Sequence, residues 1–169
     1  MCTTSIPYFK EMIIMAFTCD NCGYKNSEAK PGGGLSDHGT KYVVQCCGQR
    51  DLGREVIKSE TARVEIPEIE LEIQAGTLGG RFTTIEGLLT LIHEELSENN
   101  PFLGGDSSDS SSTAEMQAFL ASLRRLYDGT EEVPFTFILD DAASNSYVQA
   151  RGEIADRDLY DASGRPEAT

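Results

Sequence analysis

Two cysteines separated by two residues are the strongest chemical signal in this chain of 169 residues. Cys19 and Cys22 stand in the run Cys-Asp-Asn-Cys-Gly, directly after an apolar stretch. Two thiolates at this spacing can bind one zinc ion when they lie in a tight turn, whose backbone amides stabilise the sulfur charge. A structural zinc ribbon needs a second pair about 15 to 20 residues away. The sequence therefore predicts a zinc knuckle that forms half of a ribbon site.

The other candidate zinc ligands are scattered along the chain. Cys2 stands alone, His38 follows a glycine-rich stretch, and Cys46 and Cys47 are adjacent. Because neighbouring residues of a strand point to opposite faces, at most one of the adjacent pair can join a common metal. We expect less than one zinc per chain, or a zinc ion that bridges two chains.

Three other sequence patterns are weaker candidates for a catalytic or ligand-binding site. A dithiol redox site is the alternative interpretation of the CxxC, but residues 23–27 are typical of a turn rather than of the helix that such sites require. Residues 76–84 lack the Gly-Lys-Ser/Thr ending of a phosphate loop. Asp140 and Asp141 could bind a metal or share a proton, although acidic residues after a strand usually form turns. We expect that this protein is not an enzyme.

Charge and composition point to a protein partner. Asp and Glu number 28 against 14 Lys and Arg, a net charge of -14 that would repel nucleic acid and suits a basic partner. The longest apolar run, residues 12–17, is far below the roughly 20 residues of a membrane-spanning helix, so we expect no membrane contact.

One acidic face is a candidate for binding that partner. Acidic and apolar residues alternate over residues 64–73, so one strand face could present carboxylates, although a merely solvated face fits equally well. Pro67 cannot donate a ladder hydrogen bond, which indicates an edge or surface strand. The candidate partner-binding residues are Glu65, Glu68, Glu70, Glu72 and, in the following loop, Arg81.

Strands are predicted at both ends of the chain. Residues 10–20 are typical of a buried strand, and residues 41–46 of a second one, with a loop over residues 28–39 between them. Strand-like composition returns at residues 133–139 and 145–149. The charged segment that follows is predicted to fray.

Two amphipathic helices are predicted in the middle. Thr83 and Glu86 form a capping box for the first helix, and Ser112 begins the second after a Gly/Ser/Asp-rich loop. Helically spaced apolar residues give each helix one apolar face: Ile85, Leu88, Leu89, Ile92 and Leu96 in the first, and Met116, Phe119, Leu120, Leu123 and Leu126 in the second. The sequence therefore predicts a helical hairpin at about residues 83–128, inserted into a sheet domain.

Three runs carry a resemblance to a known family. They are IPYFKE continuing into IIMAFTCDNCGYKNSE, then KSETARVEIPEIELEIQAGTLGGRFTTIEGLL, and later FTFILDDAASNSYVQ. Together they cover most of residues 6–149 and closely resemble the second unit of the ZPR-one zinc-finger family. That unit consists of a four-cysteine finger followed by an A domain.

The resemblance implies a fold and a division of the chain. The expected fold is mainly β with inserted α: a double-stranded β-helix-like A domain with a helical hairpin, preceded by half of a zinc ribbon. The expected parts are a partial finger at residues 1–30, the A domain at 31–150 and a tail at 151–169. Only Cys19 and Cys22 map onto family zinc ligands, and the family's first CxxC would precede Met1.

The resemblance also implies a function. Family members bind translation elongation factor one-alpha and assist its folding, and eukaryotic members move between cytoplasm and nucleus. We therefore expect a zinc-binding chaperone or adaptor module that is not an enzyme.

Overall fold

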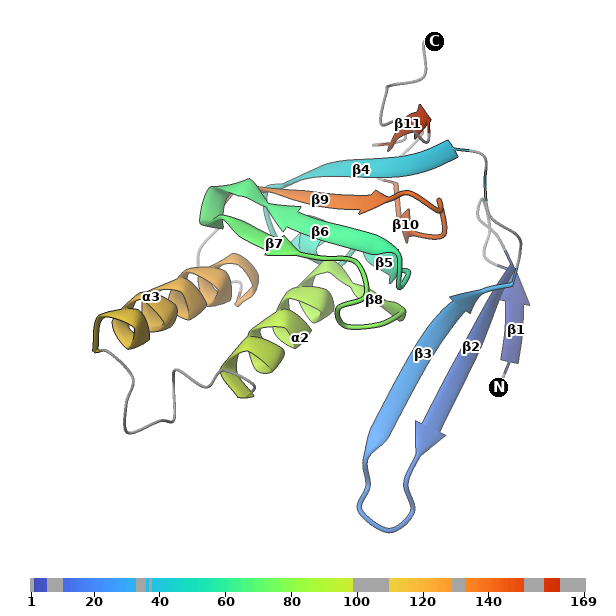
Figure 1. The fold of residues 1–169 in the computed structure, drawn as a ribbon, viewed down its shortest axis with the longest axis horizontal. Coiled ribbons are helices and arrows are strands. Elements are labelled where there is room, and N and C mark those ends of the chain that lie inside the picture. Colours follow the sequence, from blue (N-terminus) through green and yellow to red (C-terminus); the bar gives the residue numbers. More distant parts are fainter. Residues whose placement is uncertain are drawn as a thin grey trace.

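The structure of the chain, a computed structural model, describes residues 2–5, 11–32, 36, 38–98, 110–128, 133–150 and 157–161. The described strands form three sheets (Figure 1). One of them, the N-terminal sheet of strands β1, β2 and β3, projects away from a larger body that holds the remaining elements. The predicted mainly β fold with a helical insertion is confirmed.

The N-terminal sheet is antiparallel. Its strands are β1 (Cys2–Ser5), β2 (Glu11–Thr18) and β3 (Lys25–Pro31), in that order. The loop predicted over residues 28–39 is wrong at both ends, because residues 28–31 pair with β2 and residues 38–39 begin the strand His38–Cys46. Residues 33–35 and 37 lie outside the described residues. The prediction of a buried strand is wrong for Ala16 and Phe17, which are exposed on the projecting part of β2.

The body contains two sheets and the helices. The larger sheet has the order β11-β4-β9-β6-β7 and the smaller one β10-β5-β8. The strands of the larger sheet are β4 (His38–Cys46), β6 (Ala62–Ile66), β7 (Leu71–Ile73), β9 (Phe135–Asp141) and β11 (Arg157–Asp161). Those of the smaller sheet are β5 (Glu55–Lys58), β8 (Arg81–Thr84) and β10 (Tyr147–Val148). The helices are α1 (Gln49–Leu52), the 3-10 turn η1 (Pro67–Ile69), α2 (Ile85–Glu98) and α3 (Ser110–Tyr127).

Two predictions about strand position are corrected. The segment 64–73 is not one edge strand, because β6 lies between β9 and β7, and of these two strands of the segment only β7 is at an edge of the sheet. The tail does not fray throughout, because its residues 157–161 form β11 and pair antiparallel with β4. Backbone pairing along an open strand edge needs no apolar side chains, so composition gave no sign of β11.

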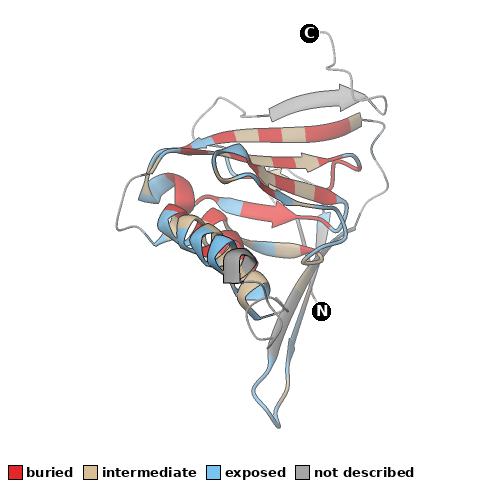
Figure 2. Ribbon diagram, turned by 60° about the vertical axis from the view of Figure 1, so that its left-hand side comes forward, coloured by how far each residue is buried: buried red, intermediate tan, exposed pale blue. Residues whose placement is uncertain are grey.

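One hydrophobic core joins both sheets to the two long helices. Buried residues alternate along β4, β6 and β9, since successive side chains of a strand point to opposite faces (Figure 2). The predicted helical hairpin is confirmed, because both helices turn their apolar stripes to this core: Ile85, Leu88, Leu89 and Ile92 from α2, and Leu120, Leu123 and Leu126 from α3. None of the described helices combines the length and apolarity that crossing a bilayer takes.

The start of α2 differs by one residue from the prediction. Thr83 belongs to β8, and the helix begins at Ile85. The hydroxyl Oγ1 of Thr84 accepts a hydrogen bond from the backbone N–H of Gly87 at 3.1 Å. Thr84 is therefore the N-cap, because its side chain satisfies an amide that has no partner within the first turn.

Candidate functional site

The predicted knuckle, residues 19–23, forms the turn between β2 and β3, at the end of the N-terminal sheet far from the body (Figure 1). The backbone N–H of Cys19 donates to the carbonyl of Tyr24 at 2.8 Å, and the N–H of Gly23 donates to the carbonyl of Cys19 at 2.9 Å. Gly23 has a φ of 74°, in the left-handed region that glycine adopts without steric cost. These bonds close the turn with Cys22 exposed and Cys19 half-buried.

The knuckle favours the thiolate form of its first cysteine. The pKa of Cys19 is lowered, first by the backbone N–H of Cys22, then by that of Asn21 and by the thiol of Cys22. The thiolate is the form that binds metal. The donor set of the knuckle therefore fits zinc, and it supplies two of the four ligands that a structural zinc ion takes.

The cysteines of the body do not reach the knuckle. Cys46 is a buried member of the core, and its pKa is raised to about 12, mainly by burial and also by the nearby charge of Asp51. Cys47 is exposed, and its backbone N–H donates to Oδ2 of Asp51 at 3.1 Å. Cys46 ends β4 and Cys47 follows it, so both cysteines lie in the body and not in the turn between β2 and β3.

The remaining candidates are also distant. The backbone of Cys2 pairs with Ile14, five residues before Cys19. At about 3.3 Å per residue this separation along β2 is about 16 Å. His38 opens β4 rather than standing in a loop. Among the described residues, no three His, Cys, Asp or Glu side chains are grouped so that they could hold a metal.

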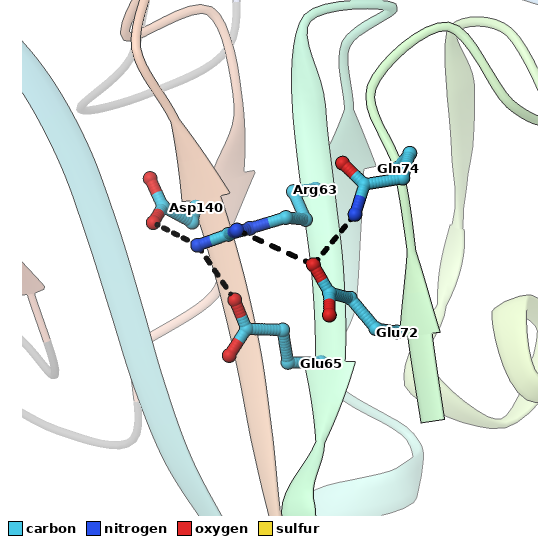
Figure 3. Close-up of polar contacts among 5 residues, drawn as sticks. All are labelled: Arg63, Glu65, Glu72, Gln74 and Asp140. Carbon is cyan, nitrogen blue, oxygen red and sulfur yellow. Dashed lines mark hydrogen bonds and ion pairs between the residues drawn. The ribbon is translucent and has the colours of Figure 1, made fainter. Parts of the chain in front are cut away.

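Part of the predicted acidic face exists as a cluster around one arginine. Glu65 of β6 stands opposite Glu72 of β7, and both carboxylates contact Arg63, at 2.8 and 3.3 Å. Arg63 also lies 3.4 Å from Oδ2 of Asp140, and Gln74 donates to Glu72 at 2.6 Å (Figure 3). Three carboxylates around one guanidinium leave this cluster with a net negative charge.

The other predicted acidic residues do not share that strand face. Glu68 lies in η1, and its Oε1 accepts bonds from the backbone N–H of Thr136 at 2.8 Å and from its hydroxyl at 2.6 Å. Glu70 ends η1 with a φ of 54° and is exposed. Pro67 begins a 3-10 turn, so the alternation of a strand is interrupted there. Arg81 is half-buried in β8 of the smaller sheet, in a different sheet from the acidic cluster, and its role in partner binding stays a prediction.

A buried carboxylate, Asp141, is a polar centre, whereas the sequence suggested a turn former or, with Asp140, a metal-binding or proton-sharing pair. Its oxygens accept bonds from the hydroxyls of Ser59 at 2.7 Å, Thr61 at 2.6 Å and Ser146 at 2.6 Å. The backbone N–H groups of Ala143 and Asn145 also donate to it, at 3.0 and 2.9 Å.

These hydrogen bonds decide the charge state of Asp141. Burial alone would raise its pKa, but the bonds from Ser146, Thr61, Ser59 and the Ala143 amide outweigh burial and lower the pKa. The clustered hydroxyl residues of KSET and of the run after Asp141 were the available signal in the sequence. The carboxylate is enclosed by donors, so it ties the two segments together and is closed to a ligand from solvent.

Lys58 ties a third segment to this centre. Its side chain is fully buried, and Nζ donates to the carbonyls of Thr77 at 2.9 Å and Ser59 at 3.2 Å. Burial lowers its pKa, while the charge of Asp141 acts in the opposite direction. Lys58 therefore holds the glycine-rich loop before β8 in place.

Comparison with known proteins identifies the family. The model of the ZPR1 zinc-finger domain matches residues 1–37, and that of the ZPR1 jelly-roll domain matches residues 50–161. This chain belongs to the ZPR1 zinc-finger family. The predicted family and fold class are thus confirmed, while the predicted division at residues 30 and 150 stays a prediction.

Relatives of the ZPR1 family occur in eukaryotes and archaea. The chain is 45% identical to zinc finger protein ZPR1 of Homo sapiens and to zinc finger chaperone zpr1 of Schizosaccharomyces pombe, in each case over 85% of this chain and 31% of that protein. An uncharacterised ZPR1-like protein of Methanocaldococcus jannaschii is 27% identical over 87% of this chain and 71% of its own length. The chain thus spans about a third of the length of its eukaryotic relatives.

Proposed function

We propose that this chain is a non-enzymatic chaperone or adaptor module that binds translation elongation factor one-alpha and assists its folding in the cytoplasm and nucleus. The observation that carries the proposal is the 45% identity, over 85% of the chain, to a protein named a zinc finger chaperone. The elongation factor as partner follows from the family resemblance of the sequence motifs.

Charge supports a protein partner with a basic surface. The net charge of -14 favours such a partner and disfavours nucleic acid. Glu70, which ends η1, and Glu72, which lies beside Arg63, are exposed carboxylates of the candidate face. Glu68 is exposed as well, and its carboxylate accepts two hydrogen bonds from Thr136.

Binding kinetics over a range of salt concentrations test this face. The association rate with elongation factor one-alpha should fall as salt rises, since screening weakens electrostatic steering. The double variant Glu70→Lys/Glu72→Lys should slow association more than it speeds dissociation. The matched control is Glu94→Lys/Glu98→Lys, which makes the same change of charge at exposed positions of α2. An equal loss in both variants would reject the local face, and no binding by the folded chain would reject the partner.

A refolding assay tests the chaperone activity itself. Denatured elongation factor one-alpha is diluted into buffer with a molar excess of the chain, and the recovered nucleotide-binding activity is measured. The proposal predicts a higher yield than with an equal amount of an unrelated acidic protein. An equal yield would contradict assistance in folding while leaving binding to be judged from the kinetics.

The redox alternative has one observation in its favour, the lowered pKa of Cys19. The geometry after the knuckle opposes it, because Cys22 leads through Gly23 into the strand β3 rather than into a helix. A disulfide-reductase assay separates the two functions. Turnover that disappears in Cys19→Ser would favour the redox reaction, and we expect none.

A further inference from the structure

The larger sheet of the body ends at β7, a strand with one acidic and one apolar face. We propose that the edge of β7 (Leu71–Ile73) accepts an extended segment of a basic partner as an additional strand, in which Lys or Arg alternates with apolar residues. The inference rests on the proposed function for the basic character of the partner, but not on the elongation factor as its identity.

The first argument is the backbone of β7. This strand is last in the order of the larger sheet, where it pairs with β6 (Figure 1). Among the described residues, no backbone hydrogen bond outside the sheet ladders uses Leu71, Glu72 or Ile73. A strand at the edge of a sheet presents N–H and C=O groups with which another extended chain can pair. The edge of β7 therefore offers a ladder of hydrogen bonds to a partner.

The second argument is the character of the two faces of β7. On the outer face of the sheet, the side chain of Glu72 is 50% exposed (Figure 3). On the core face, Ile73 is only partly buried although the opposite Val64 is fully buried, because no further strand follows β7 in the described sheet. Successive side chains of a strand point to opposite faces. An added strand of alternating basic and apolar residues would therefore match Glu72 and Ile73 at once.

The charge around Glu72 favours a basic segment. Three carboxylates, that of Glu72 among them, surround the single guanidinium of Arg63 and leave the cluster negative. The amide of Gln74 donates to Oε1 of Glu72 at 2.6 Å, which holds this carboxylate in place. A side chain that is already held loses less conformational entropy when a cation binds. A Lys or Arg of the added strand opposite Glu72 would form a favourable cross-strand pair.

The opposite edge of the same sheet shows such pairing within the chain. The strand β11 lies at that edge and pairs antiparallel with β4 over residues 157–161. Its sequence, RDLYD, is rich in charged residues. This sheet therefore accepts a charged, extended segment at one edge, and β7 is the corresponding place at the other edge.

The length of β7 limits the affinity of this site. The strand has three residues, and shortness is one way in which proteins protect a sheet edge against uncontrolled pairing. None of the three residues is Pro or Lys, which commonly block an edge. We expect binding that is weak and readily reversed, as suits a chaperone or adaptor that must release its partner.

Hydrogen exchange in the presence of a designed peptide tests the inference. The probe is a short capped peptide in which Lys and Val alternate. Its control is the same peptide methylated at every backbone nitrogen, which keeps the charge and the side chains but cannot donate hydrogen bonds. The first peptide should slow exchange of the β7 amides and leave those of β9 unchanged. The control should bind at least about tenfold more weakly, because several hydrogen bonds are lost.

Charge reversal at the edge completes the test. Glu72→Lys should weaken binding of the Lys/Val peptide about fivefold, because a like charge then stands opposite its lysines. The matched control Glu94→Lys makes the same change of charge at an exposed position of α2 and should weaken binding less than about twofold. Equal losses in both variants would overturn the role of Glu72. Equal binding of both peptides, protection at another edge strand, or no binding at millimolar peptide would overturn strand addition at β7.

The edge of β7 and the proposed function can fail separately. If the peptide protects β7 in a chain that does not bind elongation factor one-alpha, the proposed partner is rejected and the edge site stands. If the chain binds the elongation factor while the peptide leaves β7 unprotected, the edge site is rejected and the proposed partner stands.

Discussion

The body and the N-terminal sheet are both antiparallel, but they differ in what covers their side chains. In the body, alternate residues of β6 and β9 are buried against the smaller sheet and the helical hairpin. In the N-terminal sheet, Phe17 and Tyr24 remain largely exposed beside the knuckle. The described core draws its buried residues from Tyr42 to Val148, all of them in the body.

The body and the N-terminal sheet therefore differ in what stabilises them. Burial of apolar surface stabilises the body by roughly 25 cal/mol per Å², and this contribution lies within the chain itself. The end of this sheet beside the knuckle contains only β2 and β3, because β1 pairs with residues 11–14, and a two-stranded hairpin is only marginally stable in water. We therefore expect the N-terminal sheet to take its stability from what binds at the knuckle, and the following changes test the separation.

The largest loss should come from a charge placed in the core of the body. Leu88 and Leu123 are fully buried in α2 and α3. Leu88→Asp or Leu123→Asp buries a carboxylate there, and we expect a loss of about 3–5 kcal/mol in the free energy of unfolding. Denaturant titration measures it, with the exposed Gln117→Asp of α3 as the control. Unchanged stability in both leucine variants would mean that the helices do not pack on the sheets as described.

The next largest loss should come from the buried carboxylate. In Asp141→Asn, an amide NH₂ group replaces one oxygen and faces the donors that now surround it, so we expect a loss of about 2–4 kcal/mol. The adjacent control Asp140→Asn removes only one of three carboxylates around the partly exposed Arg63 and should cost less than about 1 kcal/mol. Equal losses in urea titration would contradict the special role of Asp141.

The pH dependence of stability should report the same group. Because the pKa of Asp141 is lowered in the folded protein, its stabilising effect is complete above the unfolded value of about 4 and is lost as pH falls through the folded pKa. The difference in unfolding free energy between the parent chain and Asp141→Asn should stay constant near neutral pH and shrink in acid. A difference that widens as pH falls would contradict a lowered pKa.

The smallest effect concerns the start of α2. Thr84→Ala removes the N-cap hydrogen bond to Gly87 and should cost about 1 kcal/mol. Thr83→Ala is the comparison, since Thr83 belongs to β8 and does not cap the helix. Thermal unfolding of both variants distinguishes them, and a larger loss in Thr83→Ala would restore the capping box predicted from the sequence.

The sequence predicted those features whose causes are local. The apolar period of residues 85–96 and 116–126 identified both helices, because a buried helix face repeats within a few residues. The CxxC identified the knuckle because its two cysteines lie within one short turn. Asp141 could not be recognised as a polar centre, because Ser59 lies 82 residues away in the sequence and meets it only through the sheet pairing.

The acidic residues around Pro67 show that a real alternation in the sequence can still predict the wrong arrangement in space. The alternation around Pro67 was real, but the proline begins a 3-10 turn that places Glu68 against Thr136 and leaves Glu70 at the end of the turn. The exposure of Phe17 was equally unpredictable, because an apolar run does not show whether another element covers it. Burial depends on contacts between distant parts of the chain.

Hydrogen exchange with and without zinc tests the separation of the two regions most directly. Backbone amides of β9 should exchange at the same slow rate in zinc and in chelator, because the core of the body protects them. Amides paired between β2 and β3 should exchange at least tenfold faster in chelator and become slow when zinc is added. Amides of β2 and β3 that are as protected as those of β9 in chelator would contradict the account, and so would a loss of protection in β9 when the metal is removed.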